Sequence, residues 1–502
     1  MVFSLLGLPS HALTIFICLI LAITVLVWLR HLASDIIIRR AGGARAPVLA
    51  DNLLSASKLY YEIGKSQYHN RLVDWCTGQL DSLPTGNRTF AEFSLTGAKR
   101  VLITRDPEQI KAILATNFSH FGHGPMWHKL WHPFLGDGIF GVDGQLWHDS
   151  RSMIRPIFSK DRLRNLAIFD ACTDKLLSKI PSSGSTVDLK DLFYRWSLDT
   201  TTEFLLGENA GSLDFPIAPL IPKGEYYRAI KIIEEFIEPI IVRTLAICPT
   251  QLQQLSKSDL EFSFLHSIAI YTRDPKLIRD QIMSVLFAGR DTTAATLSWA
   301  MYELSNYPQM WAKLRKEILN KLGPQAAPTY EILKNLTYLK NVLNETLRLH
   351  PATPLNMRQA LETTTVPGRP GEADIVLLKG DSVTINVLGM HTCVDLYPPT
   401  SEKFADLKIF SPERWEHWTP KPWTYIPFSG GPRICIGQNF AMTEMAFCLV
   451  RLAQQYESIE YRGDWAAQKL QVDLIGTPAL GVPMALYKPG EATDPSFKYH
   501  IN

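Results

Sequence analysis

The segment from Phe428 to Gly437, which reads Phe-Ser-Gly-Gly-Pro-Arg-Ile-Cys-Ile-Gly, constrains this chain more than any other feature. Gly431 and Gly437 permit tight or positive-φ backbone near Cys435, so the chain can approach a flat ring closely. Phe428 supplies an apolar cover, and the helix expected after Gly437 would place its positive N-terminal end near the sulfur. These features predict a thiolate that ligates haem iron, the alternative being a Gly/Pro-rich turn with an incidental buried cysteine.

A second motif, Ala288-Gly289-Arg290-Asp291-Thr292-Thr293, lies in a long stretch of helical pattern from about Pro275 to Tyr307. The Thr292 hydroxyl can compete for the carbonyl of Ala288, four residues back, which would open a groove for dioxygen. Asp291 could then pass protons to the distal oxygen. Taken alone, the motif is also compatible with an exposed aspartate and threonines that bond to their own helix.

Together these motifs resemble the cytochrome P-450 family of haem-thiolate monooxygenases, since Phe428–Gly437 matches its haem-binding loop and Asp291–Thr292 its acid–alcohol pair. The resemblance implies a mainly α fold with small β-sheets, preceded here by one transmembrane helix. It implies haem b with Cys435 as the axial ligand of the iron, and insertion of one oxygen atom of O2 into an apolar substrate. Asp291 and Thr292 would be the catalytic residues.

Further residues match the same family pattern. Glu345, Arg348 and Arg414 resemble its Glu-Arg-Arg network, whose role would be to hold the scaffold of the cysteine loop. The residues expected to bind haem, several of them through its propionates, are Trp147, Arg151, Arg358, His391, Phe428, Arg433 and Gly437. His391 is equally well explained as a buried structural histidine.

The segment Gly136–Gly141 satisfies the pattern GxGxxG but predicts no nicotinamide site, because no convincing strand precedes it and no βαβ pattern surrounds it. Electrons must therefore come from a partner. The family resemblance implies an NADPH-cytochrome reductase, with cytochrome b5 as a second candidate donor.

The N-terminal region predicts a membrane anchor. It contains no Lys, Arg, Asp or Glu from Met1 to Leu29, and its apolar run would span roughly 27 Å as a helix, about the hydrocarbon core of a bilayer. The arginines that follow predict a cytosolic catalytic domain, and a cleavable signal peptide is the alternative. We expect a single-pass anchor of the endoplasmic reticulum membrane at 1–30, a basic linker at 31–50 and the haem-thiolate monooxygenase domain at 51–502.

Composition excludes several other classes of protein. The 502 residues carry 51 Lys and Arg against 49 Asp and Glu, and this net charge of +2 gives no electrostatic argument for a nucleic-acid partner. The seven cysteines are scattered and lack CxxC spacing, which argues for a reducing compartment without a disulfide framework or zinc site.

The substrate is predicted by a narrower resemblance. Residues 135–140 and 272–275, with the two motifs above, are similar to the fungal group that hydroxylates n-alkanes and fatty acids near the chain end. An alkyl or fatty-acyl chain is therefore expected. The region 207–272 is shorter than in that group, which leaves as alternative a tailoring oxidase of a polyketide, terpenoid or peptide natural product. A peroxide-dependent haem-thiolate isomerase and a non-catalytic haem sensor are disfavoured by Asp291–Thr292.

Overall fold

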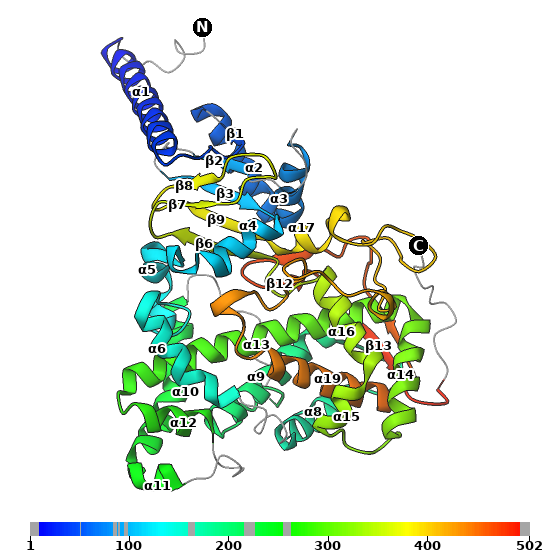
Figure 1. Cartoon of the computed structure of the whole chain (residues 1–502). Helices are drawn as coiled ribbons and strands as arrows, with labels where there is room; N and C mark the ends of the chain where they lie inside the picture. Colours follow the sequence, from blue (N-terminus) through cyan, green and yellow to red (C-terminus); the bar gives the residue numbers. More distant parts are fainter. Residues whose placement is uncertain are drawn as a thin grey trace. The chain divides into compact units, whose positions relative to one another are not determined.

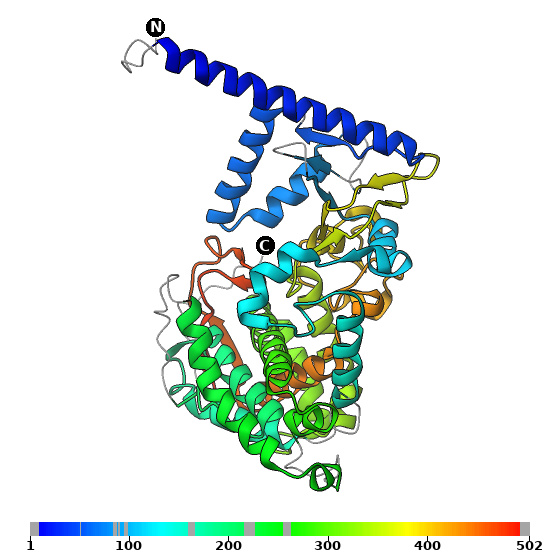
Figure 2. The same ribbon diagram turned by 90° about the vertical axis from the view of Figure 1, so that its left-hand side faces the viewer.

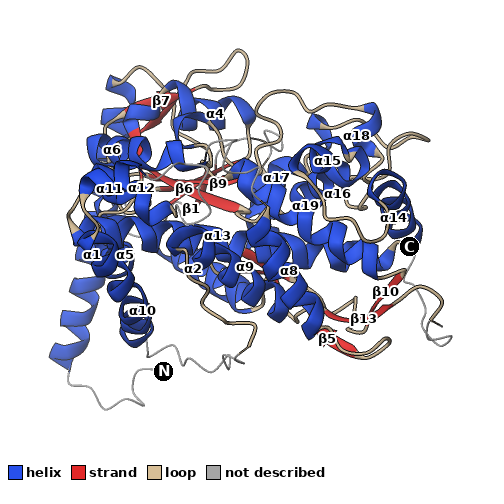
Figure 3. Cartoon of the chain, turned by 90° about the horizontal axis from the view of Figure 1, so that it is seen from below, coloured by secondary structure: helices blue, strands red, loops and turns tan. Residues whose placement is uncertain are grey.

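The computed structural model describes residues 10–50, 52–83, 88, 91–94, 99–158, 166–214, 226–254 and 263–491. The described chain is mainly helical with small β-sheets, which confirms the predicted fold class (Figures 1 and 3). It forms two compact units, one of Met1–Gly124 with Leu355–Met390 and one of Pro125–Pro354 with His391–Asn502.

The first helix, α1 (Ser10–Arg40), is long and apolar enough to cross a membrane over Ile17–Arg40, with a mean hydropathy of 2.0 (Figure 2). Residues 1–9 of the expected anchor lie outside the described residues. The helix continues past residue 30, where we expected the linker to begin. Nothing in 31–40 breaks it, because the next glycines along the chain are Gly42 and Gly43, and basic residues suit a helix C-terminus.

A six-stranded sheet organises the first unit, in the order β1 (Val48–Ala50), β2 (Ala91–Phe93), β3 (Val101–Thr104), β9 (Ser382–Asn386), β6 (Leu355–Ala360) and β4 (Phe121–Gly122). The strand-like runs 99–104 and 382–387 form β3 and β9, which pair in parallel with Val101 opposite Ser382. Arg100 and Asp381 form a buried ion pair beside this junction. The remaining elements are α2 (Leu53–Tyr68), α3 (Leu72–Asp81), α4 (Pro107–Lys111), β7 (Thr364–Val366) and β8 (Ile375–Leu377), while α17 (Val387–His391) ends at the unit boundary.

Helix α13 (Pro275–Asn306) is the central element of the second unit and occupies the range that the sequence predicted. It begins where Asp274 accepts a hydrogen bond from the Lys276 N–H, with Pro275 at the first helical position. Its most extensive packing partner is α9 (Leu189–Leu206), and it also contacts α10 (Tyr226–Ala246), α16 (Thr337–Leu349) and α19 (Gln438–Gln455).

The other elements of the second unit are α5 (Gly124–Leu135, whose first residue belongs to the first unit), α6 (Gly144–Ile154), α8 (Ala167–Lys179), α11 (Pro249–Gln254), α12 (Phe264–Tyr271), α14 (Pro308–Leu322), α15 (Tyr330–Asn335) and α18 (Arg414–His417). A three-stranded sheet has the order β10 (Ser458–Tyr461), β13 (Pro483–Tyr487) and β5 (Thr186–Asp188), and a hairpin pairs β11 (Leu470–Val472) with β12 (Gly476–Pro478).

Candidate active site

The cysteine loop is held by backbone geometry. The Cys435 N–H donates to the Phe428 carbonyl at 3.0 Å, and Ser429 and Gly431 adopt φ values of 64° and 67°. Gly437 has φ −83°, so of the tight or positive-φ backbone that the sequence allowed at this position, the positive φ does not occur. A Cβ at this position would lie 4.0 Å from Cys435 Sγ, an ordinary van der Waals distance, so Gly437 lies directly beside the sulfur.

The Cys435 residue is partly accessible, yet its thiol is surrounded by protein, and this burial raises the pKa of the thiol. The Gly437 N–H and the charge of Arg151 oppose this shift only in part. Burial thus opposes ionisation of the sulfur, while the Gly437 N–H and Arg151 favour it, and the thiolate ligand stays a prediction. A metal cation bound to the sulfur would supply the missing stabilisation.

Helix α6 brings an indole and a guanidinium to the same loop. Arg151 donates to the Ile434 carbonyl at 2.9 Å, and its guanidinium lies 5.7 Å from the centre of the buried Trp147 ring. The Arg433 guanidinium lies 4.5 Å from the same ring. Arg433 also pairs with Asp143 at 2.6 Å, and burial lowers its pKa to about 10. Trp147, Arg151 and Arg433 thus form one cationic cluster beside Cys435.

The two remaining candidates for propionate binding are placed differently. His391 is completely buried, its Nε2 accepts the Ile426 N–H at 3.0 Å, and burial lowers its pKa to about 3. This neutral acceptor fits the structural explanation of His391. Arg358 lies on β6 in the first unit, where its Nη1 donates to Asn356 Oδ1 and to the Met357 carbonyl, each at 2.7 Å. Propionate binding by either residue stays a prediction.

On α13, the Thr292 hydroxyl donates to the Ala288 carbonyl at 2.7 Å, a bond that both explanations of the motif include. Asp291 is not the exposed surface residue of the alternative explanation, since its side chain retains 27% of its exposure. Burial raises the pKa of its carboxyl group, against the opposing charges of Arg290 and Lys190. An acid with a raised pKa next to a hydroxyl is suited to holding and releasing a proton.

The Glu345–Arg348–Arg414 network is formed by fully buried side chains. Arg348 donates to both oxygens of Glu345 at 2.8 Å, and Arg414 lies 3.4 Å from Glu345 Oε1. Arg414 also donates to the carbonyls of Ala405 and Asp406, so the network ties α16 to the segment before the cysteine loop.

The sequence reasoning missed Glu444. This fully buried residue of α19 accepts a hydrogen bond from the Thr293 hydroxyl at 3.2 Å, and burial raises its pKa to about 8. Thr293 follows Thr292 on α13, so a second titratable carboxyl group contacts the same stretch of helix. A glutamate inside the apolar run of α19 was the available signal.

Comparison with known proteins decides the family, because the model of the family "Cytochrome P450" matches residues 93–262 and 223–469. The chain belongs to the cytochrome P450 family. It is 43% identical over 436 residues to Cytochrome P450 monooxygenase pvhE of Talaromyces variabilis, covering 78% of this chain and 81% of that protein. It is 36% identical over 448 residues to Cytochrome P450 52A3-A of Candida maltosa, covering 80% and 84%. It is 34% identical over 481 residues to Cytochrome P450 52A12 of Debaryomyces hansenii, covering 86% of this chain and 90% of that protein.

As a cytochrome P450, the chain is a haem-thiolate monooxygenase, and its residues fit that cofactor. Cys435 offers a soft sulfur ligand, and a bound cation would offset the burial that raises the pKa of its thiol. Arg151 and Arg433 offer the planar guanidinium groups that suit propionate carboxylates. When bound, haem supplies the iron chemistry that activates dioxygen.

Proposed function

We propose that this cytochrome P450 hydroxylates an alkyl or fatty-acyl chain at the endoplasmic reticulum membrane, with electrons from NADPH through a separate reductase. The observation that carries the proposal is the Thr292–Ala288 hydrogen bond beside the half-buried Asp291. Monooxygenation consumes protons, and this pair offers both a hydroxyl and a carboxyl group to move them. A peroxide-dependent isomerase or a haem sensor has no use for such a pair.

Each residue has a distinct role in this proposal. Cys435 ligates the iron, and Phe428 and Gly437 shape the space around its sulfur. Asp291 takes up protons from the α9 side, where Lys190 lies near it, and Thr292 positions them. The buried Glu345, Arg348 and Arg414 hold the scaffold of the loop. The residues that bind the propionates are Trp147, Arg151 and Arg433, with Arg358 and His391 as additional candidates.

An apolar substrate is supported by an aromatic group on α5 and α13. The ring of Phe287, next to Ala288, lies 5.9 Å from that of Trp131 and 5.6 Å from that of Phe134. Apolar walls hold a hydrocarbon chain mainly through the area that it buries. The resemblance to the fungal hydroxylases of n-alkanes and fatty acids favours such a chain. A tailoring oxidase of a natural product is the second candidate, because the region 207–272 is shorter than in that fungal group. Within this region, 215–225 and 255–262 lie outside the described residues.

Membrane attachment and electron supply belong to the same proposal. Helix α1 would anchor the chain in the endoplasmic reticulum membrane with the catalytic units in the cytosol, beside a membrane-bound reductase or cytochrome b5.

The test is product formation in membranes reconstituted with the full chain, reductase and saturated fatty acids of increasing chain length. Hydroxylated product that requires NADPH and depends on chain length is expected. Turnover with peroxide but without reductase would contradict the monooxygenase cycle. Reduction of the haem by NADPH, seen in its absorption spectrum, without any hydroxylated fatty acid would favour the natural-product candidate.

A further inference from the structure

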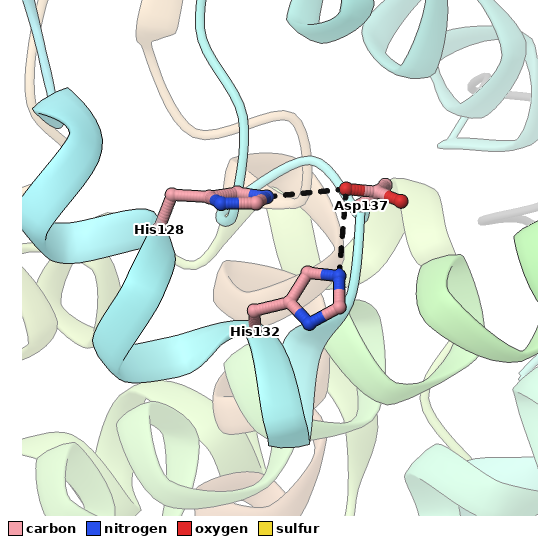
Figure 4. Close-up of side chains that lie close together, drawn as sticks. All are labelled: His128, His132 and Asp137. Carbon is pink, nitrogen blue, oxygen red and sulfur yellow. Dashed lines mark hydrogen bonds and ion pairs between the residues drawn. The ribbon is translucent and has the colours of Figure 1, made fainter.

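A second potential metal centre lies on α5 and the loop that follows it. The side chains of His128, His132 and Asp137 each offer one ligand atom, and these atoms lie within 4.8 Å of one another (Figure 4). The two histidines are four residues apart, so they occupy the same face of the helix. Figure 4 shows both imidazole rings directed toward the Asp137 carboxylate. We propose that these three residues bind a zinc ion.

The distances suit a shared metal better than hydrogen bonds alone. Nε2 of His128 lies 3.1 Å from Asp137 Oδ1, while Nε2 of His132 lies 3.8 Å from the same oxygen. A hydrogen bond therefore accounts for His128 only, since the second distance is too long. A tetrahedral zinc ion about 2.0–2.1 Å from each ligand would separate the ligand atoms by roughly 3.3 Å. Small adjustments of exposed side chains would bring both nitrogens to that spacing.

The position of Asp137 is fixed before any metal binds. Its N–H donates to Asp280 Oδ2 at 2.9 Å, and Lys276 holds its Oδ2 at 2.8 Å, which leaves Oδ1 facing the histidines. Gly136 has φ +53°, and a Cβ there would overlap the Asp280 carboxyl group. Such outer contacts orient a ligand and reduce the cost of binding.

The local charge also favours a cation. Ion pairs join Asp137 and Asp280 to Lys276, and Arg279 to Asp280 and Glu234. Three carboxylates against two basic side chains leave this network with a net charge of −1. Two imidazoles and one carboxylate form a ligand set typical of zinc with an open fourth position, and they disfavour magnesium and calcium. The seven cysteines, which predicted no zinc site, take no part.

Zinc at this position would link α5 to the loop 136–141. The same helix carries Trp131 and Phe134, whose rings contact Phe287 of α13. The metal would therefore stabilise the helix that holds this aromatic group, and amide exchange over residues 126–137 is expected to slow when it binds.

The experiment measures zinc bound by the full-length haem protein, without a histidine tag, by equilibrium dialysis. A Cys248→Ser background removes an exposed thiol that would also bind zinc. One zinc ion per chain is expected in this background and in the matched control His69→Ala, an exposed histidine elsewhere in the chain. Binding should fall at least tenfold in His128→Ala and His132→Ala, whose haem spectra report intact folding.

Zinc K-edge absorption on the wild-type chain tests the ligands without any variant. Scattering from two imidazoles and an oxygen is expected, together with slowed amide exchange in α5 that the His128→Ala/His132→Ala double variant lacks. Three results would each overturn the proposal. They are sulfur scattering, unchanged zinc binding in the double variant, and no zinc bound at 100 μM, a concentration on the order of the weakest useful dissociation constant.

Discussion

Glu444 is a fully buried carboxyl group of α19 that accepts a hydrogen bond from the Thr293 hydroxyl. Its pKa of about 8 lies above the ordinary value of 4.5. Between these two pH values the folded chain keeps a proton that the unfolded chain has lost. The free energy of unfolding should therefore fall as pH rises through this window, by up to roughly 1.4 kcal/mol per pH unit.

Glu444→Gln should remove this pH dependence. The amide cannot ionise and its oxygen can still accept from Thr293, so the variant should be more stable than the parent by about 2–4 kcal/mol at pH 8 and similar at pH 5. Thermal unfolding of the haem protein from pH 5 to pH 8.5 measures the difference. Parallel pH profiles for parent and variant would show that Glu444 is already ionised in the fold.

Thr292→Ala should separate electron consumption from product formation. Loss of the hydroxyl that bonds the Ala288 carbonyl removes a proton-handling group, so product per NADPH should fall on the order of tenfold while hydrogen peroxide rises. The matched control is Thr296→Ala, one turn further along α13, whose hydroxyl donates to the Thr292 carbonyl at 2.8 Å. An equal yield of product per NADPH in both variants would show that Thr292 does not have its proposed role.

At this scale, contiguous motifs were predictable and distant partners were not. The cysteine loop and the Asp291–Thr292 pair could be identified because their residues are neighbours in the chain. Asp143, which pairs with Arg433, and Thr293, which bonds Glu444, are separated from their partners by 290 and 151 residues. No local pattern reports such contacts, and the burial that raises the pKa of the Cys435 thiol also arises only in the fold.

At the scale of the elements, the GxGxxG pattern of the loop 136–141 has a packing role. The sequence excluded a nucleotide site there, and the structure gives the glycines another purpose. Cβ atoms at Gly136 and Gly138 would overlap Asp280 and Ser284 of α13, so glycine allows the loop to lie directly against that helix. The spacing of the glycines is typical of a backbone that another group approaches closely. Here that group is helix α13 and not a nucleotide.

The Glu345 network predicts the largest loss of stability. Glu345→Gln would leave the buried guanidinium groups of Arg348 and Arg414 without their counter-charge, at a cost of about 3–5 kcal/mol. The expected result is a chain recovered mostly without haem, as measured by haem absorbance per protein. Glu402→Gln, on an exposed loop, is the control. Normal haem content in Glu345→Gln would show that the network is dispensable for the cysteine loop.

For the whole molecule, the N-terminal helix predicts that the chain stays with the membrane fraction. Full-length protein should remain with membranes after alkaline extraction, while a chain lacking residues 1–40 should be released and keep its haem spectrum. Release of the full-length chain would mean that α1 does not span the bilayer. Length and hydropathy predicted the helix, but its end at Arg40 depends on Gly42 and Gly43, which follow it.

The central claim is that Cys435 provides a thiolate ligand to haem iron in a monooxygenase. The most direct test is the Soret band of the ferrous carbon monoxide complex, recorded for the parent chain and for Cys435→Ser with Cys448→Ser as control. The account predicts the red-shifted band of a thiolate-ligated haem in the parent and the control, and its loss in Cys435→Ser. Persistence of that band in Cys435→Ser would contradict the assignment of the ligand and the site built around it.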